Sequence, residues 1–215
     1  MNFTIEPILP CDLGELELCI QDTFPRGEPM ARALALAPED YLDYTRLVAR
    51  KAVRDKLSVG AWSDSRRLLG FCVNEDMATS PRYSAAAVSP RMMPLLVLLE
   101  ELDDEYLQAR TLRVGQVFHL YMLGVREEAR GQGVARALVA ESVSLARTLR
   151  FRRAVAETTG NTSRKICEDQ GFRSQYAIAY RNFCFKSKPV FSQLEGPEHC
   201  HLVEHPLLSE GNHEA

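Results

Sequence analysis

Hydrophobic and polar residues follow one another along this chain with two periods, one typical of strands and one typical of helices. Short runs rich in β-branched and aromatic residues predict strands at 3–9, 57–63, 67–77, 115–125, 152–158, 176–185 and 189–194. Apolar stripes at helical spacing predict helices at 11–24, 38–56, 94–108, 134–149 and 161–171. Strands and helices are therefore expected to alternate through most of the chain.

Two segments interrupt this alternation. Pro25, Gly27 and Pro29 are expected to break the chain after the first helix. Residues 78–113 form an insertion, with a loop-like first half and a helix that carries leucines on one side and acids on the other. Because no repeat or low-complexity linker is present, we predict one domain over residues 1–205, followed by a loose tail at 206–215.

The bulk composition narrows the classes of function. The 215 residues are 46% hydrophobic and 26% charged, which is typical of a globular protein in water. A net charge of −3 gives no excess of positive charge of the kind that binds the phosphates of a nucleic acid. Apolar runs stay well short of the ~20 residues that span a bilayer, and the first residues do not resemble a signal peptide. A cytoplasmic protein without a membrane partner is therefore expected, as a monomer or a homodimer.

Cysteines and histidines offer little support for a metal site. The six cysteines are dispersed without a CxxC pair, so we expect reduced thiols that are mostly buried. The segment HCHLVEH places His199 and His201 on one face of a possible strand. A complete ligand set of known spacing does not accompany them, so a polar strand end is the favoured interpretation and no metal is expected.

The segment RGQGVA, at 130–135, is the strongest chemical signal. It lies between the apolar run at 115–125 and the helix that begins near Val134. Gly131 and Gly133 let the backbone adopt conformations closed to other residues and approach a ligand closely. The positive end of a helix and its free N–H groups then favour a phosphate. A plain strand-to-helix turn, with glycines for tightness, is the alternative interpretation.

The residues after the glycines separate the nucleotide-binding motifs. Val134 and Ala135 stand where a Walker loop requires Lys and Ser or Thr, and Arg136 stands where a dinucleotide fingerprint requires its third glycine. The pattern that remains, R-x-x-G-x-A, resembles the acetyl-CoA pyrophosphate loop of the GNAT acetyltransferase superfamily. The following strand and the short helix that ends in EDQGF fall in the same order as in that superfamily.

This resemblance covers most of the chain, from about residue 3 to residue 185, and implies a fold. The implied fold is α+β, with a mixed central sheet of about seven strands, helices on both faces and a splay at the acetyl-CoA site. Shorter pieces, namely TFPRGEPM, VAETTGNTSRKICEDQGF and KPVFSQLEGPEH, are similar to the insect-type arylalkylamine N-acetyltransferases. This second likeness rests on short motifs.

The resemblance implies acetyl-CoA as the acetyl donor and a small amine as the acceptor. The strand at 115–125 would pair with the pantetheine arm, the glycine loop would hold the pyrophosphate, and the short helix would contact the cofactor further on. Arg164 and Lys165 are open candidates for the 3′-phosphate. The residues implied for cofactor binding are Leu123, Gly124, Val125, Arg130, Gly131, Gln132, Gly133, Val134, Ala135, Asn161 and Ser163.

A base must take the proton of the acceptor ammonium. The resemblance assigns this role to Glu28, in the EP motif after the first helix, because a partly buried carboxylate can titrate near neutral pH. The alternative for Glu28 is a first-turn carboxylate that complements a helix dipole, with Pro29 at the first helical position. His119 is a second candidate base, although a lone histidine in an apolar strand is more often a packed core residue.

The general acid for the leaving thiolate stays open. Cys167 stands where many members of the superfamily carry a tyrosine, so Cys167, Tyr176, Tyr180 or water could protonate the thiolate. The expected function is acetyl-CoA-dependent N-acetyltransfer to the primary amine of a small molecule, an arylalkylamine or a polyamine. Acetylation of a peptide or protein amine, and a non-catalytic acyl-CoA sensor, are the alternatives.

Overall fold

A computed structural model of the chain describes residues 2–108 and 110–208. The strands are β1 (Thr4–Pro7), β2 (Val59–Trp62), β3 (Leu68–Asp76), β4 (Val117–Val125), β5 (Arg153–Thr158), β6 (Arg173–Ala179) and β7 (His199–Pro206). The α-helices are α1 (Leu13–Gly27), α2 (Pro29–Ala33), α3 (Leu42–Asp55), α4 (Met93–Leu107), α5 (Val134–Thr148) and α6 (Asn161–Asp169). Single 3₁₀ turns cover Pro10–Asp12, Pro38–Tyr41, Met77–Thr79, Pro90–Met92, Glu127–Ala129 and Tyr180–Asn182.

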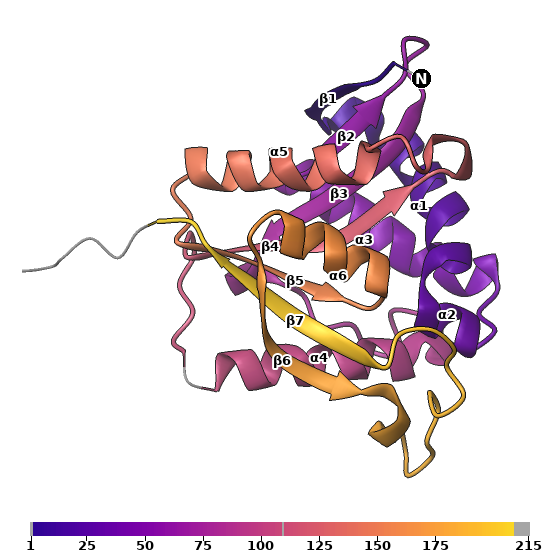
Figure 1. Ribbon diagram of the computed structural model, residues 1–215. Helices are drawn as coiled ribbons and strands as arrows, with labels where there is room; N and C mark the ends of the chain where they lie inside the picture. The colour runs from indigo at the N-terminus through magenta and orange to yellow at the C-terminus, as the bar shows by residue number, and fades with distance from the viewer. Residues whose placement is uncertain (1, 109, 209–215) are drawn as a thin grey trace, which may run out of the picture.

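The strands form one sheet in the order β1-β2-β3-β4-β5-β7-β6 (Figure 1). β4 and β5 run parallel, and the other neighbouring pairs run antiparallel. Helices α5 and α6 pack on one face, and α1, α3 and α4 pack on the other, so each face of the sheet has its own apolar core. The predicted mixed sheet of about seven strands with helices on both faces is confirmed.

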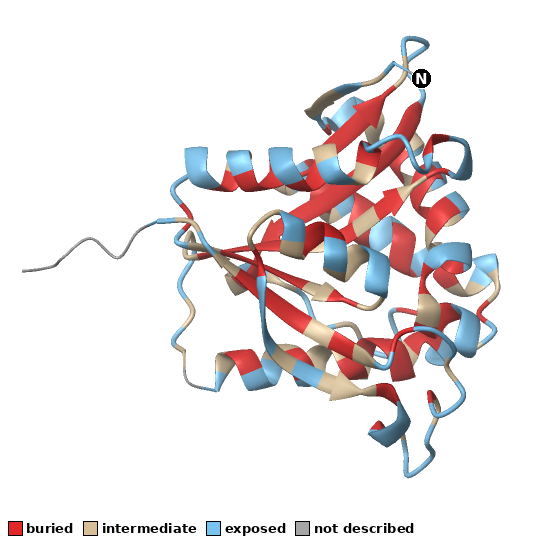
Figure 2. Cartoon of the chain, in the orientation of Figure 1, coloured by how far each residue is buried: buried red, intermediate tan, exposed pale blue. Residues whose placement is uncertain are grey.

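Burial follows this layered plan (Figure 2). β3 is buried at every position, and β4 is buried along its first half, because both lie at the centre of the sheet and are covered on both faces. β6 is largely exposed or half-buried, since it is the edge strand and pairs with β7 alone. The continuous apolar pattern of residues 117–125 therefore reflects a position between two helix layers.

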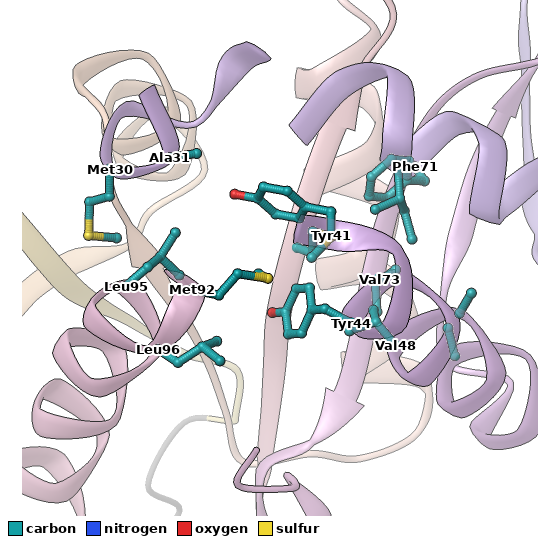
Figure 3. Close-up of a cluster of buried hydrophobic side chains, with 14 of the residues drawn as sticks. Met30, Ala31, Tyr41, Tyr44, Val48, Phe71, Val73, Met92, Leu95 and Leu96 are labelled. Atoms are coloured by element: carbon teal, nitrogen blue, oxygen red, sulfur yellow. The ribbon is translucent and has the colours of Figure 1, made fainter. Parts of the chain in front are cut away.

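An apolar cluster joins the insertion to the first half of the chain (Figure 3). Met30 of α2 and Tyr41, from the turn before α3, lie opposite Met92 and Leu95 at the start of α4, and all four are buried. The rings of Tyr41 and Tyr44 meet edge to face, with centroids 6.3 Å apart. The helix of the insertion is thus part of the main core, and its packing holds α2 in place.

The predicted break after the first helix falls later than expected. α1 continues through Pro25 to Gly27, and the Glu28 N–H still donates to the Phe24 carbonyl at 3.0 Å. A proline is tolerated here because only one backbone donor is lost, near the end of the helix. α2 then begins at Pro29, where the fixed φ of proline suits the first helical position.

The last part of the chain differs from the prediction. Residues 189–194 form turns and not a strand, because Phe191 is buried against Phe183, with stacked rings 5.6 Å apart. The strand predicted at 176–185 begins earlier, at Arg173, and ends at Ala179. The segment taken as a polar strand end is β7, which lies between β5 and β6 in the sheet.

Three further expectations concern the C-terminal tail, the cysteines and membrane-spanning helices. Of the predicted tail, Pro206 closes β7 and Leu207 donates to the Arg152 carbonyl at 2.9 Å, whereas residues 209–215 lie outside the described part. All six cysteines are free thiols, and four of them are buried. In the ranges 2–108 and 110–208, no helix has the length and apolar character that crossing a bilayer requires.

Candidate active site

The sheet opens between β4 and β5. The two strands pair over three positions, from Val117 opposite Arg153 to His119 opposite Val155. β4 then runs on to Val125 with β3 on its other edge. The edge of residues 120–125 that faces away from β3 therefore borders a gap, and this gap is the splay that the family resemblance implied.

A cavity of about 930 Å³ lies at this opening. Its walls come from the end of β4, the loop before α5, the start of α6 and the junction between α1 and α2. The predicted cofactor residues line it together, except Gln132, whose side-chain amide donates to the Glu128 carbonyl at 2.8 Å. Segments far apart in the sequence thus meet in one space that is large enough for an extended ligand.

The glycine loop has the conformation that the sequence predicts. Gly131 and Gly133 have φ angles of 73° and 83°, in the left-handed region that favours glycine. A Cβ atom at either position would meet nothing within 4 Å, so the backbone is bare toward open space. Gly133 is also the N-cap of α5, whose first N–H groups have no acceptor within the helix. These features suit an anionic group such as a pyrophosphate.

Gly124 of β4 is required by a close contact behind the cavity. A Cβ atom there would lie 2.6 Å from the Thr23 hydroxyl of α1 and 2.6 Å from the Phe71 ring of β3. The Thr23 hydroxyl donates to the Cys19 carbonyl at 2.7 Å, which holds it against its own helix. The absence of a side chain at Gly124 therefore lets α1 approach the strand and bring Glu28 to the cavity.

The start of α6 forms the opposite wall. Asn161 and Ser163 line the cavity, and Ser163 donates its hydroxyl to the Gly160 carbonyl at 2.9 Å. The Gly160 N–H donates back to the Ser163 hydroxyl at 3.3 Å. This reciprocal pair caps the helix and fixes its first turn beside the gap.

Glu28 both caps α2 and lines the cavity. One carboxylate oxygen accepts the N–H of Ala31, so the helix-capping alternative from the sequence describes a real contact. The side chain is only 5% exposed, and its second oxygen, Oε1, has no hydrogen-bond partner among the described residues. The group therefore has a free acceptor atom on a side chain that is almost fully shielded from solvent.

The same burial sets the acidity of Glu28. Loss of hydration raises its pKa from 4.5 to about 7, against the opposing effect of hydrogen bonds from the N–H groups of Ala31 and Met30. A carboxylate with this pKa is present in both forms near neutral pH. It can accept a proton from a neighbouring group and release it again, which is the requirement for a general base.

His119 lies at the point where β4 and β5 separate, outside the cavity lining of the described residues. Its Nδ1 is 3.2 Å from Glu75 of β3, and its Nε2 is 2.6 Å from Glu157 of β5. Burial lowers the pKa of His119, but the two carboxylates raise it further, so the net value is well above 6.5. A ring held as imidazolium has no lone pair for an amine proton, which leaves Glu28 as the better placed base.

His119→Gln is expected to destabilise the fold by about 3–5 kcal/mol, since the variant leaves the buried Glu157 without its cation, whereas Glu75 keeps Lys51 at 3.0 Å. The pKa of His119 is raised on folding, so its contribution is complete below pH 6.5 and declines as pH rises through the folded value. Urea denaturation at pH 6 and pH 8.5 should therefore show a larger difference between wild type and variant at pH 6.

His199→Gln is the matched control for this prediction, because it removes an imidazole from the half-buried start of β7. It is expected to change the free energy of unfolding by less than about 1 kcal/mol. Equal stability of His119→Gln and wild type at both pH values would contradict the ion pairing of a charged His119 with Glu75 and Glu157.

The three side chains considered for the general acid lie outside the cavity lining formed by the described residues. Burial raises the pKa of the Cys167 thiol to about 12, and this side chain packs in the core under α5 and α6. The Tyr180 hydroxyl donates to the Thr159 carbonyl at 2.7 Å, and burial raises its pKa far above the usual 10. The Tyr176 ring packs edge to face on Tyr106. Water in the open cavity is the simplest remaining proton source for a thiolate.

Sequence reasoning missed several charged residues of the cavity. Arg136 lines the cavity together with Lys165, which the sequence had already offered as a candidate for phosphate binding. Arg32, whose charge acts on Glu28, and Glu195 also line the cavity. Arg164 lies instead on the far side of α6, outside the lining formed by the described residues. A helical projection could have placed Arg136 and Lys165 in the first turns of their helices, but not the two helices side by side.

The histidines of β7 have polar neighbours and not a shared centre. His201 lies 2.9 Å from Arg164 and 2.9 Å from the Ser174 hydroxyl, and His205 lies 2.8 Å from Arg147. Across residues 2–108 and 110–208, no group of three or more His, Cys, Asp or Glu side chains is arranged to hold a metal ion.

Solved structures with the same fold include several amine acetyltransferases. The C-terminal condensation domain of Ebony in complex with beta-alanyl-dopamine is 14% identical, with a TM-score of 0.87 over 96% of this chain and 99% of that chain. Arylalkylamine N-acetyltransferase 2 from Aedes aegypti is 19% identical, with a TM-score of 0.83 over 97% and 100%. The polyamine N-acetyltransferase of Drosophila melanogaster, which catalyses the formation of N-acetylagmatine, is 15% identical, with a TM-score of 0.71 over 94% and 98%.

At these identities the likeness concerns the fold. No match to this chain was found among curated protein sequences. The family assignment comes from the sequence itself, since residues 37–172 match the acetyltransferase (GNAT) family. That range contains β4, the glycine loop, α5 and all of α6, which together form most of the cavity wall, and members of the family generally use an acyl-CoA. The chain belongs to the GNAT family of acetyltransferases.

Proposed function

We propose that this protein transfers the acetyl group of acetyl-CoA to the primary amine of a small molecule, with Glu28 as the general base. One observation carries the proposal. A single cavity contains a bare glycine loop at the positive end of α5 and a buried carboxyl group with an unpartnered oxygen. The first feature suits the phosphates of the donor, and the second suits the proton of the acceptor.

The residues present fit acetyl-CoA. The φ angles of Gly131 and Gly133 and the empty space in front of them provide a cradle that a side chain would fill. Arg130 adds a guanidinium at the same end of the cavity. The unpaired edge of β4 offers backbone hydrogen-bonding groups to the amide-bearing pantetheine arm along the gap. When bound, acetyl-CoA supplies a thioester whose C–S bond breaks as the C–N bond to the amine forms.

Glu28 supplies the proton acceptor. A primary amine is mostly an ammonium at pH 7, and only the neutral form has a lone pair for attack. Oε1 of Glu28 can take the ammonium proton, directly or through a water, while the other oxygen stays bound to the Ala31 N–H. The cap therefore holds the base in a fixed orientation, which makes the two roles of the residue compatible. As the amide forms, the nitrogen releases its second proton to water, and water passes a proton to the departing thiolate, so Glu28 holds the one proton left over.

The acceptor is expected to be an amine that carries a positive charge in solution and binds with its ammonium group close to Glu28. Arylalkylamines and polyamines, the amines that the names of similar structures mention, are the first candidates. Phe24 lines the cavity next to Glu28 and offers a ring against which an aryl group or an alkyl chain can pack. Glu195 also lines the cavity and can attract an ammonium.

The direct test measures thiol release from acetyl-CoA with a panel of tyramine, dopamine, tryptamine, agmatine, putrescine and a short peptide with a free N-terminus. Mass spectrometry should show one added acetyl group on at least one small amine. Turnover confined to the peptide would favour the peptide alternative. Tight CoA binding with no acetylated product from any amine would favour the non-catalytic sensor.

A further inference from the structure

Tyr41 is a buried tyrosine whose hydroxyl has no hydrogen-bond partner among the described residues. It ends the 3₁₀ turn before α3, and its side chain is fully buried. Buried hydroxyl groups in folded proteins are nearly always hydrogen-bonded, because burial without a partner is costly. The nearby Tyr44 follows this rule, since its hydroxyl lies 2.7 Å from that of Tyr121. The Tyr41 hydroxyl is therefore an exception that points to a ligand.

The unpartnered hydroxyl is directed toward the end of α2 that Glu28 caps. Figure 3 shows it pointing from Tyr41 toward Ala31, whose N–H donates to one oxygen of Glu28. Burial raises the pKa of Tyr41 far above its usual 10, and the charge of Glu28 is the largest electrostatic effect that adds to this rise. Oε1 of Glu28 is likewise buried and without a partner among the described residues. Two uncommitted polar atoms from different segments therefore lie in the same buried region.

Two neighbouring polar side chains already have partners. Asp40 accepts hydrogen bonds from Ser89 and Arg91, each at 2.8 Å. The Tyr180 hydroxyl donates to the Thr159 carbonyl at 2.7 Å. Neither side chain is thus available to satisfy the two uncommitted atoms.

An acceptor can reach this region from the cavity past Phe24. Phe24 and Glu28 both line the cavity, and the Phe24 ring meets the Tyr41 ring edge to face, with centroids 6.3 Å apart. Tyr41 lies behind that lining, in an apolar cluster with Met30 and Met92. Methionine side chains are unbranched and adapt readily to a new neighbour. The hydroxyl therefore becomes accessible when a ligand displaces the half-buried Phe24 ring.

We propose that the Tyr41 hydroxyl and Oε1 of Glu28 together bind the ammonium group of the acceptor; this inference rests on the proposed function. A primary ammonium has several N–H donors, so one can point to the carboxylate and another to the Tyr41 oxygen. Because burial raises the pKa of Tyr41, its hydroxyl stays neutral and holds the amine without taking its proton. After Glu28 has taken one proton, the contact with Tyr41 keeps the nitrogen oriented for attack on the thioester.

Tyr41→Phe is the test of this contact, because it removes the hydroxyl and keeps the buried ring. With acetyl-CoA and the best amine of the panel, KM for the amine should rise about 10–100-fold, as expected for the loss of a hydrogen bond to a charged group. The change in kcat should stay within about threefold, since the contact is made both before and during the attack. The melting temperature should stay the same or rise, because the lost hydroxyl was buried without a partner.

Tyr44→Phe is the matched control, since it deletes the hydroxyl of a neighbouring buried ring. It leaves the Tyr121 hydroxyl without its partner, so the melting temperature should fall by about 2–4 °C. Both KM and kcat should match those of wild type, because the pair of Tyr44 and Tyr121 lies outside the proposed contact.

Three results would overturn the inference. An unchanged KM in folded Tyr41→Phe would remove the contact but leave the proposed function intact, because wild type would still acetylate the amine. A loss confined to kcat would place the hydroxyl in the transfer step and not in amine binding. A lower melting temperature of Tyr41→Phe would show that a partner within the protein holds the hydroxyl. If wild type acetylates no amine of the panel, the proposed function fails and this inference fails with it.

Discussion

Glu28→Gln is expected to lower kcat/KM for acetyl transfer by about 10²–10⁴-fold, because glutamine keeps the size of the side chain but accepts no proton from the ammonium. The amide oxygen can still accept the Ala31 N–H, so α2 should stay capped and CoA affinity should change little. Steady-state kinetics with the best amine of the panel, together with calorimetry of CoA binding, would measure both quantities.

The pH profile gives the sharper form of this prediction. The pKa of Glu28 is about 7, and a base works only when ionised, so wild-type kcat/KM should rise with pH through that value. The variant should lose this limb and recover only at high pH, where more of the amine is already neutral. Glu195→Gln, which removes another carboxylate of the cavity lining, should keep the limb near pH 7. An unchanged profile in Glu28→Gln would assign the proton transfer to solvent.

Stability offers an independent check on the same residue. Folding raises the pKa of Glu28 above 4.5, so ionisation disfavours the folded state as pH rises from 4.5 to about 7. Glu28→Gln removes this cost, and its free energy of unfolding should therefore fall less than that of wild type across this interval. A residue that only capped a helix would show the opposite, a small loss of stability on substitution at neutral pH.

Gly133→Glu is expected to weaken CoA binding by about 100-fold or more. The new side chain would enter the empty space in front of the loop, and its carboxylate would repel a pyrophosphate that several N–H groups otherwise hold. The left-handed φ of 83° adds about 1–2 kcal/mol of backbone strain, which lowers stability but does not by itself remove a ligand. Titration calorimetry with CoA measures the loss.

Gly115→Glu separates strain from ligand contact. Gly115 has a φ of 82°, and a Cβ there also meets nothing within 4 Å, yet it lies before β4 and outside the lining of the described cavity. The two variants should lose similar stability, but only Gly133→Glu should lose CoA affinity. Tight CoA binding by folded Gly133→Glu would reject the phosphate interpretation of the loop.

Local signals in the sequence predicted the local structure around the cavity. Gly131 and Gly133 indicated a bare turn before a helix, and Pro29 indicated the start of α2, because both effects depend on neighbouring backbone atoms. The order of strands and helices, through its resemblance to a known family, also led to the correct sheet. These features need no knowledge of which distant segments meet.

The missed features depend on contacts between distant segments. Glu75 and Glu157 contact His119 from two other strands, and no spacing in the sequence indicates that these three residues meet. Asp169 brings Arg136 and Lys165 together across two helices for the same reason. β7 was interpreted only as a polar strand end, because its histidines interrupt the apolar pattern, although Cys200, Leu202 and Val203 are fully buried, the first two in one core and the third in the other. In the turns at 189–194, a buried aromatic residue produced a false strand signal.

The place of β7 in the sheet has a consequence for biosynthesis. β6 is made before β7, yet its neighbour in the sheet is β7 alone, and β7 also covers the outer edge of β5. On the ribosome, the nascent chain therefore carries one exposed strand edge and one unpartnered strand until residues 199–206 have left the exit tunnel. Unpaired strand edges can pair with strands of other chains, so the nascent chain is prone to aggregation during this interval. Fast pairing of β7 with both neighbours is expected to govern the yield of folded protein.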